Sequence, residues 1–140
     1  MYTVDDQDEV VPLTGFPLPD IGAPLPRLDS DEHEATITYF VQGSRDARAT
    51  VTFSGLCALL SGPPNDEALH GHPLASRGLE SYGVFEIKQS SWVRALERMN
   101  RVHPRHLPEH FDMLRHVVIT FHDSTFECVA ESATVTQEQT

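Results

Sequence analysis

Residues 115–131 read RHVVITFHDSTFECVAE, and this stretch predicts two β-strands folded back on each other about Asp123 and Ser124. Aspartate tolerates the left-handed backbone that a tight hairpin turn requires. With this two-residue loop, one face of the hairpin carries only apolar pairs, as a correct strand register should give. Those pairs are Phe121 with Phe126, Ile119 with Cys128, and Val117 with Ala130. The opposite face is polar and ionisable, so we expect a core on one side only.

The preceding residues predict further antiparallel strands. Residues 35–41 and 47–53 alternate apolar and polar side chains, and a five-residue loop at 42–46 pairs Ile37 with Val51. The second of these strands is expected to continue over 56–60 after a kink at Gly55. Residues 79–88 form a third candidate strand.

One main helix is expected at 91–102, with Ser90 or Ser91 as its N-cap and Pro104 beyond its end. Its apolar stripe includes Trp92, Leu96 and Met99, which we expect to be buried. Residues 108–114 form at most one or two further turns. The predicted fold class is therefore α+β, an antiparallel sheet of about five strands with one main helix packed on a face.

Three segments organise the chain: an acidic, proline-rich extended arm at 1–30, a single α+β domain at 31–131 and a tail at 132–140. The arm holds five of the ten prolines, which forbid helix. Residues 1–34 carry nine acids and one base, a charge of −8, whereas residues 35–140 carry twelve acids and nine bases, a charge of −3. The arm is also rich in apolar residues, so it packs either on its own domain or on another protein.

The composition excludes several classes of function. A net charge of −11 disfavours nucleic acid and anionic membranes as partners. No apolar run approaches the roughly 20 residues of a membrane span, and no signal-peptide pattern opens the chain. Cys57 and Cys128 lie in apolar contexts without CxxC spacing, which predicts reduced, buried thiols in a cytoplasmic protein.

Eight histidines raise the question of a metal site. The candidate ligands are His70 and His72 of the HGHP loop, with His122 of the hairpin, since imidazole is a usual zinc or iron ligand. No third ligand follows at a fixed spacing and HExxH is absent. Solvated or hydrogen-bonded histidines are therefore the favoured interpretation, and no cofactor is expected.

The candidate catalytic pair is His122 and Glu127, which are diagonal neighbours in the predicted hairpin and within reach of general acid–base chemistry. A triad of His122, Asp123 and Ser124 fails because adjacent residues alternate across a strand. Our favoured expectation is that the chain has no catalytic residue.

Candidate partner-binding residues lie in two places. Phe16, Leu18 and Ile21 are apolar anchors in the arm. Arg94, Arg98 and Arg101 of the helix, with Arg105 beyond its end, make a locally positive surface on an acidic protein. This surface is either a solvated helix face or a binding site for an acidic segment, which could be the protein's own arm.

Five motifs together resemble a group of small bacterial proteins to which no activity is attached. They are GHPL at 71–74, GLE-x-Y at 78–82, E-x-x-x-SxW at 86–92, N-x-x-HP at 100–104 and FHDSTFEC at 121–128. The resemblance covers about residues 35–131 and leaves the arm outside. It implies a bacterial cytoplasmic domain and supplies no catalytic residue.

Two classes of function follow. The first is a non-catalytic protein-binding or accessory domain, such as an immunity-type inhibitor or a subunit of a bacterial complex, whose partner is another protein or a second copy. The alternative is a small metal-dependent or His/Glu acid–base enzyme that uses the histidine-rich loops.

Overall fold

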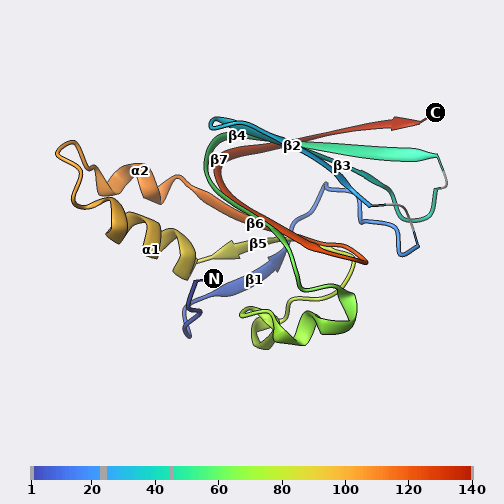
Figure 1. Ribbon diagram of the computed structural model, residues 1–140, viewed down its shortest axis with the longest axis horizontal. Coiled ribbons are helices and arrows are strands. Elements are labelled where there is room, and N and C mark those ends of the chain that lie inside the picture. The colour runs from blue at the N-terminus through green and yellow to red at the C-terminus, as the bar shows by residue number, and fades with distance from the viewer. Residues whose placement is uncertain (1, 23–24, 45, 140) are drawn as a thin grey trace.

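A bent antiparallel sheet of seven strands, in the order β1-β5-β6-β7-β4-β3-β2, forms the body of the protein (Figure 1). The computed structural model describes residues 2–22, 25–44 and 46–139. The strands are β1 (Glu9–Pro12), β2 (Arg27–Ser30), β3 (Glu34–Phe40), β4 (Ala47–Gly62), β5 (Val84–Lys88), β6 (Arg115–Thr120) and β7 (Thr125–Gln139). The helices are the 3-10 helices η1 (Asp66–Gly71) and η2 (Ala75–Arg77), and the α-helices α1 (Ser91–Asn100) and α2 (Pro108–Asp112).

The long strands β4 and β7 run together through the bend of the sheet (Figure 1). The predicted kink at Gly55 is present: this residue has φ 64°, and the β4–β7 register shifts between Leu56 and Ala58. A Cβ at position 55 would lie 2.5 Å from the side chain of Glu131 on β7, so the site requires glycine for space as well as for its backbone.

The main core lies between the two parts of the bent sheet. The rings of Phe53 and Phe126 lie 5.4 Å apart between centroids, and those of Tyr39 and Phe121 lie 5.5 Å apart. The expected apolar face of the C-terminal hairpin is fully part of this core, namely Val117, Ile119, Phe121, Phe126, Cys128 and Ala130. The alternation of apolar and polar residues along the strands therefore assigned these side chains to the correct face.

The opposite face of β6 and β7 is also buried, which corrects the expectation of a core on one side only. Val118 packs there with Leu69 and Leu74 of the η1–η2 segment, and Tyr2 and Val10 of the arm cover the same cluster. The ionisable residues of this face, His116 and Glu127, are consequently removed from solvent.

The predicted fold class is wrong, because the protein is mostly a seven-stranded antiparallel sheet with short helices, and not five strands with one main helix. The arm supplies the two additional strands: β1 pairs with β5, and β2 pairs with β3. Proline at the end of β1 fits this position, since an edge strand tolerates a missing backbone donor. Residues 132–139, expected as a tail, continue β7 beside β4.

Helices α1 and α2 form a helical hairpin that extends away from the sheet (Figure 1). Ser90 caps α1 as expected, because its hydroxyl accepts a hydrogen bond from the Val93 amide at 3.2 Å. The expected buried stripe is wrong beyond the first turn. Only Ser91 and Trp92 are buried, whereas Met99 is 69% exposed. None of the helices in the described ranges is both long and apolar enough to cross a membrane.

Two register predictions have different outcomes. The β3–β4 register is confirmed, with Ile37 opposite Val51. The β6–β7 register differs by two residues from the prediction, since Ile119 lies opposite Phe126. The loop spans 121–124 rather than two residues, and the Phe121 amide donates to the Ser124 carbonyl at 2.9 Å. A shift of two preserves the faces, which explains why the core residues were still correct.

Both cysteines are free thiols. Cys128 is buried as expected, and burial raises its pKa above the ordinary value of a thiol. Cys57 is exposed, which corrects the expectation that both thiols are buried.

Candidate functional site

A buried carboxylate, Glu127 of β7, is the centre of the largest polar cluster. Its side chain is 1% exposed and accepts hydrogen bonds from three other side chains. His72 Nε2 lies 2.6 Å from Oε2, and His116 Nε2 lies 2.8 Å from Oε1. The hydroxyl of Tyr2 donates to Oε1 at 2.5 Å. The cluster therefore joins the arm, the η1–η2 segment, β6 and β7.

The hydrogen bonds at the far side of each imidazole define its tautomer. The Leu74 amide donates to His72 Nδ1 at 3.0 Å, so the ring proton of His72 is on Nε2. The hydroxyl of Ser90 lies 2.8 Å from His116 Nδ1 and already accepts from the Val93 amide, so its own proton is free to bond Nδ1. His116 Nε2–H donates to Glu127 Oε1 on the other side of the ring. Both imidazoles are thus Nε2–H donors to one carboxylate.

The electrostatics of the cluster favour an ionised Glu127. Burial raises the pKa of this carboxyl group, but the hydrogen bonds from His116 and His72 outweigh burial and hold its pKa at about 2. Burial, followed by the charge of Glu127, raises the pKa of Tyr2 well above that of an ordinary phenol. The cluster is a buried carboxylate surrounded by three hydrogen-bond donors.

The N-terminal segment closes the cluster against solvent. The ring of Tyr2 stacks on Trp92 with centroids 5.2 Å apart and meets His116 edge-on at 5.3 Å. Buried Asp8 accepts a hydrogen bond from the Ser91 amide at 2.7 Å and thereby anchors this segment to the start of α1. The N-terminal segment is therefore part of the covering that keeps Glu127 from solvent.

The donor set also argues against metal binding at this cluster. His72 Nε2 carries a proton and has no free lone pair in this tautomer, whereas a metal ligand needs one. The two imidazoles contact different oxygens of Glu127. Within the described ranges, no three His, Cys, Asp or Glu side chains are arranged to hold a metal ion.

The structure does not bring the predicted catalytic pair together. Val118, not His122, lies opposite Glu127, and His122 is in the loop after β6. The His122 Nδ1–H donates to Asp66 Oδ2 at 2.9 Å. The predicted metal ligands also have different environments. His72 bonds Glu127, His122 bonds Asp66, and His70 is exposed on η1.

Asp66, Tyr82 and His122 form a second, accessible cluster. The hydroxyl of Tyr82 donates to Asp66 and lies 3.2 Å from His122 Nδ1. Tyr82 has φ 56°, a backbone conformation that non-glycine residues seldom adopt. Its hydrogen bond lowers the pKa of Asp66, and the same bond raises the pKa of Tyr82 to about 12. Asp66 therefore orients His122 through Nδ1, while Nε2 lies 3.8 Å from Asp123 Oδ1.

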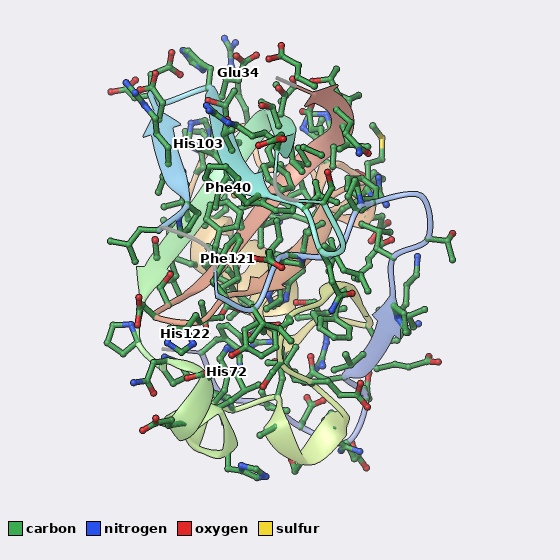
Figure 2. The ribbon with its side chains drawn as sticks, turned by 90° about the vertical axis from the view of Figure 1, so that its right-hand side faces the viewer. Glu34, Phe40, His72, His103, Phe121 and His122 are labelled. Carbon is green, nitrogen blue, oxygen red and sulfur yellow. The ribbon has the colours of Figure 1, made fainter. Side chains whose placement is uncertain are left out.

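Figure 2 shows His122 and His72 beside the green η1–η2 segment. An open hollow at this end of the sheet is lined by Pro63, Pro64, His72, Pro73 and Asp123. The accessible His122 cluster thus borders a mainly apolar depression. The sequence predicted that His122 and Glu127 form one site. In the fold they belong to two clusters, since His122 is accessible and Glu127 is buried.

The predicted partner-binding residues have different environments. Arg94 forms a bidentate ion pair with Asp5 of the arm at 2.6 and 2.8 Å, and Arg101 pairs with Glu97 at 2.8 Å. Arg98 is exposed and makes no ion pair within the described ranges. Of the arm anchors, Phe16 packs against the main core, while Leu18 and Ile21 are exposed.

The helical hairpin carries a surface that the sequence prediction missed. Four large apolar side chains are exposed on it, and so are Arg98 and Arg105. We call this the hairpin surface: Met99, Val102, Leu107 and Met113, with Arg98 and Arg105. The apolar members were partly assigned to the core because they continue the stripe of Trp92.

Tyr2, Asp8, Asp66 and Tyr82 are further site residues that the prediction did not single out. The one available signal was the presence of ionisable His116 and Glu127 on central strands, which requires buried partners. Comparison with known proteins adds nothing to these assignments, because no family model, no curated protein and no solved structure matches the chain.

Proposed function

We propose that this is a non-catalytic, cytoplasmic protein-binding domain that docks an acidic, amphipathic partner on the hairpin surface. An accessory subunit or an immunity-type inhibitor of a bacterial complex fits this description. The observation that carries the proposal is the exposure of four large apolar side chains, of which Val102 is 92% and Met99 is 69% exposed. Large apolar side chains that are exposed to solvent mark interaction sites where they adjoin one another.

The hairpin is internally organised, which supports a binding role. The side chain of Asn100 lies 3.0 Å from His106 Nδ1, and the ring of His106 packs on Phe111 with centroids 5.7 Å apart. The Arg94–Asp5 ion pair holds its base to the arm. A pre-organised surface loses little conformational entropy on binding. Burying each large apolar side chain contributes roughly 1.5–3 kcal/mol, and the unpaired Arg98 favours an acidic partner.

The test uses two matched variants. Met99→Asp/Val102→Asp places charges on the hairpin surface, and Leu18→Asp/Ile21→Asp places the same charges on the exposed part of the arm. The partner is first identified by mass spectrometry of the native complex, and its affinity for each purified variant is then titrated by calorimetry. We expect the hairpin variant to lose at least about tenfold in affinity and the arm variant to retain it. The reverse pattern would assign binding to the arm and refute the hairpin proposal.

A second candidate function rests on the Asp66–His122 pair. A half-exposed imidazole oriented by a carboxylate has the arrangement of a general base. Screening of model esters and amides tests this candidate. Activity that is lost in both His122→Asn and Asp66→Asn, but kept in His70→Asn, would support an enzyme. Activity that survives both changes would reject it.

A further inference from the structure

One half of β7 is an open sheet edge. Strand β7 pairs with β4 along its whole length, from Thr125 to Gln139. On its other side it pairs with β6 only as far as Ala130, which lies opposite Arg115. Within the described residues, no strand and no other backbone hydrogen bond covers the outer side of 131–139. This segment spans about 30 Å of strand, with alternate residues directing their N–H and C=O groups outward.

The other outer strands of the sheet are protected in ways that this segment is not. Strands β1 and β2 have only four residues each, and β1 ends in Pro12. Short edge strands and edge prolines are common defences against pairing with another chain. Residues 131–139, ESATVTQEQ, contain no proline, glycine, lysine or arginine, and their centre is the β-branched run Thr134, Val135 and Thr136. Figure 1 shows this end of β7 along the rim of the molecule, away from the helical hairpin.

The segment is complementary to itself in antiparallel orientation. A two-fold axis through Val135 pairs all nine residues of the open edge with those of a second copy. In that register Thr134 lies opposite Thr136, Ser132 lies opposite Glu138, and Glu131 lies opposite Gln139. No two like charges are opposed. A slip of one residue would place Glu131 opposite Glu138, and opposed like charges destabilise a strand pair.

The side chains agree with this register. Ala133 and Val135 are partly buried on the side of the main core, while Thr134 and Thr136 are exposed on the other side. Directly opposed residues of an antiparallel pair project to the same face. Pairing would therefore bring the two Val135 side chains together and extend the core of one copy into that of the other. The polar face would remain polar across the junction.

We propose that residues 131–139 are a self-association strand, through which two copies of the chain form one continuous antiparallel sheet. The interface is isologous, because each copy contributes the same segment about a two-fold axis. Its affinity rests on backbone hydrogen bonds and the central Val135 contact. Since it is narrow, we expect a dissociation constant in the micromolar range, roughly 1–100 µM.

Substitution of Thr134 and Thr136 by charged residues tests the register. These positions are exposed, and their β4 neighbours are Thr52 and Thr50, so added charges meet no charged residue across that strand pair. Three double variants are compared: Thr134→Lys/Thr136→Lys, Thr134→Glu/Thr136→Glu and Thr134→Lys/Thr136→Glu. In the proposed dimer, position 134 of each copy lies opposite position 136 of the other copy. The first two variants therefore place like charges opposite each other at both of these contacts, whereas the third variant places unlike charges there.

Sedimentation velocity of the wild type and variants, over about 5–500 µM protein, measures the association. Circular dichroism first verifies that each variant keeps the wild-type fold. We expect the wild type and the Lys/Glu variant to dimerise. The Lys/Lys and Glu/Glu variants should self-associate with an affinity at least about tenfold lower. An equimolar mixture of the Lys/Lys and Glu/Glu variants should recover a dimer.

Two results would overturn the proposal. One is a wild type that stays monomeric over the whole concentration range. The other is a dimer that the Lys/Lys and Glu/Glu changes leave unaffected, which would assign association to another surface. Since the hairpin surface is not altered in these variants, this outcome is independent of partner binding at α1 and α2.

Discussion

At the scale of single residues, Glu127 shows how hydrogen bonds can accommodate a buried carboxylate. Three donors, from Tyr2, His72 and His116, face its two oxygens. Each donor is itself positioned by another contact, such as the Leu74 amide on His72. Networks of this kind stabilise when every member is satisfied and become costly when one is not.

Glu127→Gln should therefore destabilise the protein although it preserves the shape of the side chain. The amide NH2 would face an N–H donor, either His72 Nε2–H or the His116 and Tyr2 donors. His72 cannot reverse its tautomer without losing the Leu74 bond. We expect a loss of about 3 kcal/mol in the free energy of unfolding, measured by urea denaturation. Exposed Glu67→Gln is the control and should stay within about 0.5 kcal/mol of the wild type.

The pKa of Glu127 also predicts how stability depends on pH. Its folded pKa of about 2 lies below the ordinary value of 4.5, so it contributes stability above pH 4.5 that is lost as the pH falls toward 2. The exposed Asp5 behaves in the same direction, because its hydrogen bonds with Arg94 lower its pKa from 3.8 to about 2. Urea unfolding between these pH values should show falling stability in the wild type. A wild-type slope that Glu127→Gln leaves unchanged would contradict the role of Glu127.

At the scale of elements, local periodicity was informative wherever a strand contacts its sequence neighbours. The core face from Val117 to Ala130 and the pairing of Ile37 with Val51 could both be predicted. The turn was less predictable, because the loop at 121–124 and a two-residue loop give the same faces. Strands β1 and β2 were missed since prolines obscure the alternation and their pairing partners are distant along the chain.

The candidate sites were less predictable for the same reason. Tyr2 lies 125 positions from Glu127, and Asp66 lies 56 positions from His122. No local pattern relates such residues. The stripe of α1 was misassigned because an apolar face indicates burial in some interface, whether within the chain or with a partner.

The start of α1 offers a matched pair of serine variants. Ser90 caps the helix and bonds His116, whereas the buried hydroxyl of Ser91 has no hydrogen-bond partner within the described residues. Ser90→Ala should cost about 1–2 kcal/mol, while Ser91→Ala should be neutral or slightly stabilising. Thermal unfolding followed by circular dichroism measures both. Equal losses at the two positions would show that the cap and the His116 bond contribute little.

At the scale of the whole molecule, the arm and the body share one sheet. Strand β1 covers the β5 side and β2 covers the β3 side, so the arm occupies both outer positions of the sheet order. Between these strands, Leu13 and Phe16 pack against the main core, and the hydroxyl of Tyr39 donates to the Pro17 carbonyl at 2.7 Å. The arm is thus integrated with the body at several separate points.

Deletion of residues 1–30 should consequently abolish cooperative folding, although the sequence predicts an arm at 1–30 and a single domain at 31–131. The deletion would expose the edges of β3 and β5, uncover the core beneath Phe16 and leave Glu127 without its Tyr2 donor. Near-ultraviolet circular dichroism and thermal unfolding of the truncated chain measure the effect. Leu18→Ser/Ile21→Ser, which alters only exposed arm side chains, is the control and should unfold like the wild type. A truncated chain that keeps a sharp unfolding transition would show that residues 31–140 fold alone and that the arm's packing is dispensable.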